Sequence, residues 1–369
     1  MQTNPQTNKL FTWGDNQSGK LALNEGEQND KKSSPCQVPG TNWKSVTTGY
    51  GKNGIDHGHG IKTDGTLWGW GNNAKGQIGV NDRTQYSSPI QIPGTTWATV
   101  TNAGEQNTLA VKTDGTIWSW GSNSYSGPLG HNNRTSYSSP TQIPGTNKYL
   151  TSELGFQGYN YWSAVIQSNN DFWVWGNNND GQLGMNNRTR YSSPVQLPGI
   201  YNRNKLMQSG SYHMGATATN GQLHTWGKNN AGQLGDGSRT SRSRPTQIPG
   251  TTWKQSCGGT TSSAAVKTDG TLWSWGDNTQ GELGLNSRTQ FSSPKQIPGT
   301  NWSNVRAQGL SKYAVKTDGT AWSWGINEFG QLGLNDRTNR SSPAQIPGTA
   351  WNVINPILNS ALGLQVTPT

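Results

Sequence analysis

A Trp-Gly dipeptide recurs seven times in this chain, at intervals of about 50 residues. Regular spacing over 369 residues overrides the two or three domains that length alone suggests. Because one short repeat cannot bury its apolar face alone, the units must pack against one another. We therefore predict a single domain over residues 1–369, with residues 1–8 a flexible N-terminal segment. The tryptophans are Trp13, Trp70, Trp120, Trp175, Trp226, Trp275 and Trp324.

Other positions repeat with the dipeptide. An Asn stands two residues after each glycine of Trp-Gly, as Asn73 does, and its side chain is expected to bond the backbone of a turn. Gly-Gln-Leu-Gly or a variant follows, and its last glycine, such as Gly284, is expected to need positive φ or tight packing. A Pro-Gly pair closes each unit.

Each unit predicts four short strands. In residues 97–145 they are Trp97–Gly104, Thr108–Lys112, Thr116–Gly121 and Ser139–Ile143. Lys-Thr-Asp-Gly joins the second and third strands in several units, and Asp-Gly between apolar runs is typical of a β-hairpin. Four-stranded antiparallel sheets at this period predict an all-β fold, a seven-bladed β-propeller.

The two ends of the chain predict how the ring closes. Residues 351–369 match the first two strands of a unit, and Lys9–Gly14 match the third strand. We expect Ala361–Val366 to pair with Lys9–Trp13, so that the terminal strands share one blade. This pairing leaves no open sheet edge between the first and last units.

With Trp-Gly-x-Asn, Gly-Gln-Leu-Gly and the final Pro-Gly, the sequence resembles the regulator of chromosome condensation repeat family. The residues of its repeats are similar to those of family members from bacteria and bacterial viruses. The resemblance covers about residues 8–369 and implies a seven-bladed propeller. The family's founder, a guanine-nucleotide exchange factor, carries a protruding wedge. The units here are nearly uniform and leave no long insertion for one, so the resemblance does not imply exchange activity.

Composition restricts partners more than it identifies them. The net charge of +10 favours acidic partners, and 18 Trp with 49 Gly indicate an ordered chain. Cys36 and Cys257 lie outside any metal-type spacing, which indicates neither a disulfide framework nor a zinc site. The polar N-terminus has no apolar signal segment, and no apolar run is long enough to span a membrane. We expect cytoplasmic synthesis and no membrane insertion; the final compartment stays open.

The candidate binding residues are arginines. One arginine, followed by Thr, recurs in the loop between the third and fourth strands of six units, with Lys31 and Lys32 near the seventh position. Four more arginines thicken this ring, and they depart from the repeat. Equivalent loops lie on one face of a propeller, so the set is a candidate site for an anionic partner. The alternative is that each repeated arginine holds its own loop through backbone carbonyls or a neighbouring Asp such as Asp82 or Asp336. The repeated residues are Arg83, Arg134, Arg188, Arg239, Arg288 and Arg337, and the additional ones are Arg190, Arg242, Arg244 and Arg340.

Few residues suggest catalysis. Asp56-His57-Gly58-His59 places two imidazoles on one face of a strand, as a metal pair requires, but no third ligand stands at suitable spacing. We predict no cofactor, no metal site and no enzymatic activity. The divergent stretch Thr151–Trp162 departs most from the repeat.

These observations leave three functions. The first is a non-enzymatic interaction or structural protein, including a capsid, tail or surface component of a bacterium or bacterial virus, with a protein or anionic glycan as partner and nucleic acid as a variant. The second is a regulator of a nucleotide-binding protein, similar to an exchange factor. The third is a glycan-active enzyme. The sequence leaves the oligomeric state open.

Overall fold

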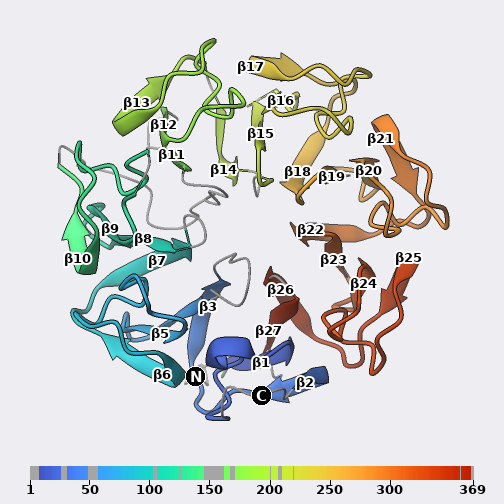
Figure 1. Ribbon diagram of the computed structural model, residues 1–369. Coiled ribbons are helices and arrows are strands. Elements are labelled where there is room, and N and C mark those ends of the chain that lie inside the picture. Colours follow the sequence, from blue (N-terminus) through green and yellow to red (C-terminus); the bar gives the residue numbers. More distant parts are fainter. Residues whose placement is uncertain are drawn as a thin grey trace, which may run out of the picture.

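The computed structural model describes residues 8–25, 31–48, 57–102, 106–124, 126–144, 162–166, 171–199, 201–206, 210–218, 220–357 and 359–366. Seven antiparallel sheets stand around a common axis as the blades of a ring (Figure 1). The predicted seven-bladed β-propeller is confirmed. In each four-stranded blade the first strand faces the axis and the fourth lies at the rim.

The blades contain the following strands, each blade written from the axis outward. The first comprises β26 (Trp351–Ile357), β27 (Ser360–Val366), β1 (Asn8–Gly14) and β2 (Lys32–Gln37). The second comprises β3 (Trp43–Thr48), β4 (His57–Lys62), β5 (Leu67–Gly71) and β6 (Tyr86–Ile92). The third comprises β7 (Trp97–Asn102), β8 (Asn107–Lys112), β9 (Ile117–Gly121) and β10 (Tyr137–Gln142). In the fourth, β11 (Trp162–Ile166), β12 (Phe172–Gly176) and β13 (Tyr191–Leu197) are described, and residues 151–161 of the divergent stretch lie outside the described residues.

The remaining blades are regular. The fifth comprises β14 (Tyr201–Leu206), β15 (His213–Ala218), β16 (Leu223–Gly227) and β17 (Arg242–Gln247). The sixth comprises β18 (Trp253–Gly258), β19 (Ser262–Lys267), β20 (Leu272–Gly276) and β21 (Phe291–Ile297). The seventh comprises β22 (Trp302–Gln308), β23 (Ser311–Lys316), β24 (Ala321–Gly325) and β25 (Arg340–Gln345). The short 3-10 helix η1 (Gln17–Gly19) lies between β1 and β2.

The predicted closure of the ring is confirmed. β1 pairs antiparallel with β27 in the expected register, from Lys9 opposite Gln365 to Trp13 opposite Ala361. The N-terminal and C-terminal strands thus share the first blade, and Asn8, expected in the flexible segment, already belongs to β1.

The fourth strand of the third blade begins earlier than predicted, because a bulge interrupts it after its first residues. β10 starts at Tyr137, which lies opposite Gly121, whereas Ser139 was the expected start. The register shifts between Tyr137 and Thr141, so the alternating pattern of sidedness is interrupted there. A search of the sequence for alternating inward and outward residues therefore finds only the part of the strand that follows the bulge.

The repeated Asn organises the loop between the third and fourth strands, as predicted. In the second blade, the Asn73 side-chain oxygen accepts the Ile78 backbone N–H at 2.9 Å, and its amide donates to the Asp82 carbonyl at 3.1 Å. One buried side chain thus braces both ends of the loop, and it satisfies backbone groups that water does not reach. The equivalent backbone-to-Asn bond occurs in all seven units, at Asn16, Asn73, Asn123, Asn178, Asn229, Asn278 and Asn327.

The Trp of each Trp-Gly joins neighbouring blades. Trp275 is fully buried, and its indole N–H donates to the Gln233 carbonyl of the preceding blade at 2.9 Å. The glycine that ends Gly-Gln-Leu-Gly permits this approach: a Cβ on Gly284 (φ +70°) would lie 2.8 Å from the Trp324 indole nitrogen. All seven junctions carry the same bond, donated by Trp13, Trp70, Trp120, Trp175, Trp226, Trp275 and Trp324.

A second bond fastens each loop to the next blade. The Asn286 backbone N–H donates to the Ser341 carbonyl of β25 at 2.7 Å, and Gly281 lies so close that its Cβ would meet the Ser341 Cα at 2.7 Å. The loop between the third and fourth strands is consequently held at its base and against its neighbour.

We predict that Trp275→Phe lowers the free energy of unfolding by about 2–4 kcal/mol, because it removes a buried inter-blade hydrogen bond and part of a fully packed ring. Trp273→Phe is the matched control, since Trp273 is half-buried and donates to the Thr271 hydroxyl in its own hairpin. It should cost less than half as much in urea unfolding. Equal losses for the two variants would contradict the inter-blade role.

Candidate functional site

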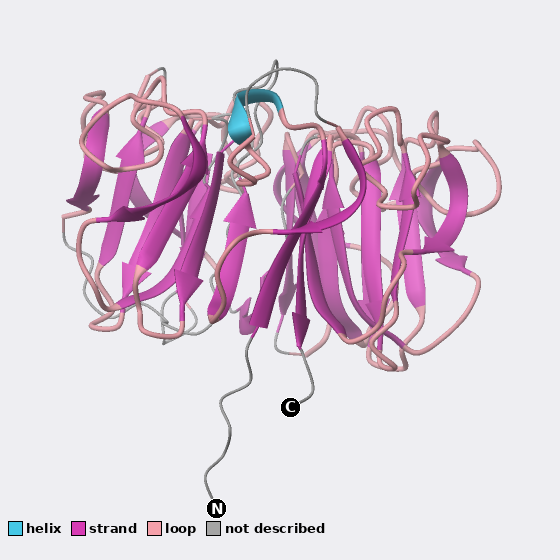
Figure 2. Cartoon of the chain, turned by 90° about the horizontal axis from the view of Figure 1, so that it is seen from below, coloured by secondary structure: helices cyan, strands magenta, loops and turns pink. Residues whose placement is uncertain are grey.

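The arginine-bearing loops share one face of the ring. Each joins the third to the fourth strand of its blade, and η1 occupies the equivalent loop of the first blade. Figure 2 shows η1 at one face, whereas β1 begins and β27 ends at the opposite face. Because the blades repeat, the other loops of this type lie on the η1 face.

The loop places its arginine at the tip of a turn. In the second blade the Thr84 backbone N–H donates to the Asp82 carboxylate at 3.0 Å, which closes a turn around Arg83. The residue before the arginine thus accepts from the residue after it, and Arg83 is exposed between them. The same closure recurs around Arg134, Arg188, Arg239, Arg288 and Arg337.

The repeated arginines are not needed to hold these loops. All six are exposed. Arg239 bonds Gln290 of the next blade at 3.3 Å. The other five make no side-chain hydrogen bond or ion pair with any residue that the structure describes: Arg83, Arg134, Arg188, Arg288 and Arg337. Asp82 bonds Thr84, Tyr86 and Asn73 instead of Arg83.

Most of the additional arginines do hold loops. Arg242 begins β17 and pairs with Asp236 at 3.0 Å, and Arg340 begins β25 and pairs with Asp336. Tyr86 occupies the same strand position in the second blade, where its hydroxyl donates to Asp82 at 2.7 Å. The first residue of the outer strand therefore closes the loop, whether it is a tyrosine or an arginine.

The other basic residues near the ring differ in their contacts. The Arg190 side chain donates to the Asn179 amide oxygen at 3.0 Å, and Arg244 is exposed. Lys32 pairs with Glu25 at 3.0 Å, and the Lys31 ammonium lies 4.7 Å from the centre of the Phe329 ring. The two lysines near the seventh position are therefore engaged in local contacts, and the exposed arginines are the six repeated ones, Arg190 and Arg244, of which Arg190 is bonded to Asn179.

The two imidazoles on β4 are packed inside the junction between the second and third blades. His57 and His59 are fully buried with ring centres 5.3 Å apart. His57 bonds the Thr108 hydroxyl at 3.2 Å, and His59 bonds the Ile78 carbonyl at 3.3 Å. Burial, followed by the neighbouring His59, holds the pKa of His57 well below its usual value. Asp56 lies outside the described residues, and within them no three His, Cys, Asp or Glu side chains gather to hold a metal ion.

A buried charged pair escaped the repeat pattern. Glu282 stands where most units have Gln, and Lys312 of β23 stands where the sixth and third blades have Ser263 and Thr108. Glu282 and Lys312 are fully buried. The Lys312 ammonium donates to the Ser262 hydroxyl at 2.6 Å. Burial raises the pKa of Glu282 and lowers the pKa of Lys312, and each charge opposes the shift of the other. The sequence signal was available: both residues break the repeat, in consecutive units.

The cysteines are unpaired. Cys36 is half-buried, and Cys257 is fully buried, which raises its pKa to about 11. Cys257 is thus an inert packing thiol at neutral pH.

The comparison with known families agrees with this architecture. The profile described as "Regulator of chromosome condensation (RCC1) repeat" matches residues 64–111, 114–152, 169–216, 220–266, 269–307 and 318–363. The chain belongs to this family. The match over residues 64–111 spans β5 and β6 of the second blade and β7 and β8 of the third, so the family's repeat is offset by two strands from a blade, and its matches cover most of the ring.

Individual relatives are distant. The ultraviolet-B receptor UVR8 of Arabidopsis thaliana is 26% identical over 241 residues, which are 64% of this chain and 53% of the receptor. The human E3 ubiquitin-protein ligase HERC2 is 25% identical over 184 residues, 49% of this chain and 4% of the ligase. The chain thus spans about half or less of these two relatives.

Solved structures share the fold. Prp20p from Saccharomyces cerevisiae superposes with a TM-score of 0.85 at 20% identity, covering 99% of this chain and 93% of Prp20p. Human WBSCR16 gives a TM-score of 0.84 at 19% identity, covering 98% and 100%. Within the described part of the chain, no helix is long and apolar enough to cross a membrane.

We predict that Glu282→Gln lowers the free energy of unfolding by about 1–3 kcal/mol, because it leaves the buried Lys312 without its compensating charge. The double variant Glu282→Gln/Lys312→Ser restores the residues of the preceding junction, Gln233 and Ser263, and should unfold within about 1 kcal/mol of the unmodified chain. Urea unfolding of the single and double variants measures both values. Additive losses in the double variant would show that the two charges do not interact.

The buried His213 predicts a pH effect on stability. Burial, followed by the charge of Lys312, lowers its pKa to about 3, whereas the unfolded chain has an ordinary imidazole near 6.5. The unfolded state therefore takes up a proton that the folded state does not, and stability falls as pH drops from about 6.5 toward 3, by at most about 1.4 kcal/mol per pH unit. In His213→Asn, unfolding between pH 7 and pH 5 should be less pH-dependent than in the unmodified chain. An unchanged pH dependence would exclude His213 as its source.

Proposed function

We propose that this chain is a non-enzymatic interaction protein whose arginine-tipped loops bind an anionic partner. One observation carries the proposal: the repeated arginines occupy equivalent loop tips, are exposed, and in five cases make no side-chain hydrogen bond or ion pair with described residues. A guanidinium group with five donors suits a carboxylate, sulfate or phosphate oxygen. The partner is an acidic protein surface or an anionic glycan, with nucleic acid as the variant that uses the same charges.

The loops suit binding because they are already ordered. The Asn brace, the turn around the arginine and the bond to the next blade fix the backbone beneath each tip. Binding then restricts mainly the arginine side chains, which lowers its entropic cost. The net charge of +10 adds a long-range attraction for the same partners.

Regulation of a nucleotide-binding protein is the second candidate, and the comparisons favour it. The solved structure of Prp20p was described together with the binding of that protein to Gsp1p and histones. The mouse X-linked retinitis pigmentosa GTPase regulator is 32% identical to this chain over 108 residues. Histones are basic and do not suit an arginine-tipped face, whereas an acidic patch on a GTPase does. Accelerated nucleotide release from a candidate GTPase would support this function.

The source and assembly of the protein stay proposals. The relatives named above are eukaryotic, and a bacterial or viral origin rests on the wording of the repeats alone. Capsid or tail genes beside this gene would support a virion component, and a GTPase gene would support regulation. The glycan-active alternative would require polysaccharide cleavage, which an activity screen measures.

We predict that Arg83→Ala/Arg188→Ala/Arg288→Ala weakens binding to heparin and to duplex DNA at least about tenfold and makes the remaining affinity less sensitive to salt. The charge-matched control Lys44→Ala/Arg244→Ala/Lys295→Ala removes three exposed cations outside the loop tips. It should weaken binding less than about threefold in titrations from about 50 to 300 mM NaCl, a range over which screening by salt increases. If both variants lose affinity equally, net charge and not the loop tips accounts for binding.

A further inference from the structure

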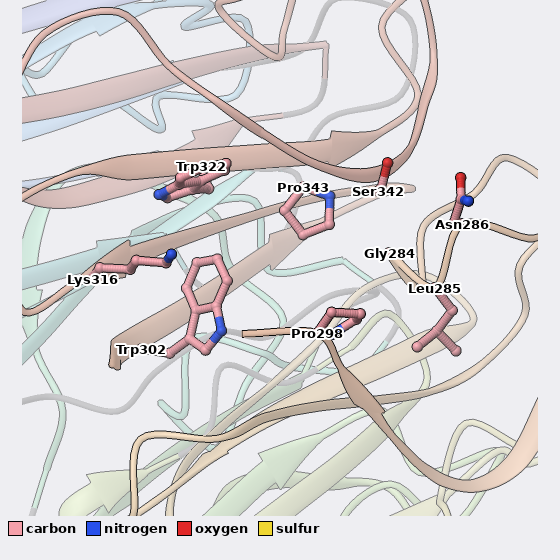
Figure 3. A pocket seen from close by; sticks show the side chains of 9 residues that line it. All are labelled: Gly284, Leu285, Asn286, Pro298, Trp302, Lys316, Trp322, Ser342 and Pro343. Carbon is pink, nitrogen blue, oxygen red and sulfur yellow. The ribbon is translucent and has the colours of Figure 1, made fainter. Parts of the chain in front are cut away.

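A pocket of about 260 Å³ opens at the junction of the sixth and seventh blades (Figure 3). The sixth blade contributes Leu285 and Asn286 from its loop, and Pro298 follows its last strand. The seventh blade contributes two tryptophans, a lysine and the rim residues of β25. Its lining from that blade is Trp302, Lys316, Trp322, Ser342 and Pro343.

The polar side-chain groups inside the pocket, away from its rim, are donors. Trp302 is 2% exposed, and its buried indole N–H has no partner among the described residues; Figure 3 shows this nitrogen on the side of Pro298. The Lys316 ammonium lies 4.8 Å from the centre of the Trp302 ring and 4.6 Å from that of Trp322. The Trp322 N–H already donates to the Thr320 hydroxyl at 3.0 Å. A fitting ligand therefore brings an acceptor to Trp302 and needs few donors of its own.

We propose that this pocket binds a proline-containing segment of an extended peptide. A proline has an apolar ring that suits walls of tryptophan, proline and leucine, and it has no backbone N–H that would need an acceptor. The carbonyl groups of the peptide are strong acceptors, and one of them receives the Trp302 indole N–H once the groups that cover this buried nitrogen move aside. The Asn286 and Ser342 side chains, exposed at the rim, bond the peptide where it leaves the pocket.

A pyranose ring suits the pocket less well. Each of its hydroxyls is a donor as well as an acceptor, and the lining is mostly apolar side chain. Hydroxyls buried there without partners would each cost more than the stacking on tryptophan returns. Acceptors stand only at the rim, on Asn286 and Ser342, so the side chains inside the pocket favour the peptide over the sugar.

Three other junctions repeat the chemistry. In each, a lysine lies over two tryptophans, and the indole N–H of the inner one is buried without a described partner. Each of these junctions also has two prolines at the positions of Pro298 and Pro343. One follows the last strand of the preceding blade, and the other lies in the outermost strand of the following blade. A partner with several prolines could engage more than one junction, which raises its effective affinity. The sets are Trp43, Lys62 and Trp68; Trp97, Lys112 and Trp118; and Trp253, Lys267 and Trp273.

This site is separate from the arginine-tipped loops and does not depend on their function. Its test is an NMR titration of the ¹⁵N-labelled chain with hexaproline, followed at the Trp302 indole resonance, which Trp302→Phe identifies by its loss. Ser342→Trp blocks the rim without altering the buried lining. Ser193→Trp is the matched control, at the same strand position in the fourth blade, whose sequence lacks the Lys-Thr-Asp-Gly lysine.

We expect hexaproline to shift the Trp302 resonance saturably, with a dissociation constant on the order of 1 mM for one short segment. Ser342→Trp should weaken this response at least about tenfold and Ser193→Trp should retain it. A Gly-Ser hexapeptide and maltose should leave the resonance in place. A shift with maltose alone, no shift with hexaproline up to about 10 mM, or an equal response in Ser342→Trp overturns the proposal. Heparin binding in Ser342→Trp reports separately on the arginine-tipped loops.

Discussion

The hydrogen bond from each Trp-Gly indole to a carbonyl of the preceding blade is the interaction on which this ring depends. A single four-stranded sheet must cover its faces with apolar side chains to be stable. Because only 29% of the residues are hydrophobic, the tryptophans supply much of the apolar surface that the sheets bury against one another. The large indole fills the space between two sheets, and its N–H fixes the distance and angle at which they meet. Since the bond occurs at all seven junctions, including Trp13 to Gln331 across the chain ends, the geometry of one junction sets the number of blades that close the circle.

The exposed arginines are a consequence of the same arrangement. The carbonyl that receives the indole belongs to the loop between the third and fourth strands, so this loop must be rigid for the blades to pack. The Asn278 side chain braces the loop of the sixth blade from inside. Further along the same loop, the Asn286 backbone N–H donates to the Ser341 carbonyl of the next blade. Because these bonds already fix the backbone, the residue at the loop tip is not needed to hold the loop. Arg288 stands at this tip and is exposed to solvent. In the blades whose outer strand starts with Arg242 or Arg340, arginine performs a duty that tyrosine performs elsewhere.

The fold was predictable from the sequence because each fold-defining residue recurs. Trp-Gly, the Asn brace, Asp-Gly hairpins and the split terminal blade all follow from spacing, and so does the register from Lys9 to Trp13. The site was only partly predictable. Position in the repeat located every arginine, but it left open which of them bind an acidic residue of their own loop. Arg83 follows Asp82 and is exposed without pairing with it, whereas Arg242 pairs with Asp236, and only the side-chain geometry shows this difference. The pocket at Trp302 was beyond sequence reasoning, since its walls come from two blades.

The charged residues of the blades and loops divide into those that have an opposite charge beside them and those that do not. Glu282 departs from the usual Gln, and Lys312 departs one unit later, on the other side of the same junction, so that the two charges offset each other inside the protein. Arg242 and Arg340 stand where other units have tyrosine, and they form ion pairs with Asp236 and Asp336. The arginines at the loop tips have no such counterpart within the described chain. A positive charge that recurs without an internal partner is the arrangement expected when the partner is another molecule, since a residue kept for packing would be matched by its neighbours.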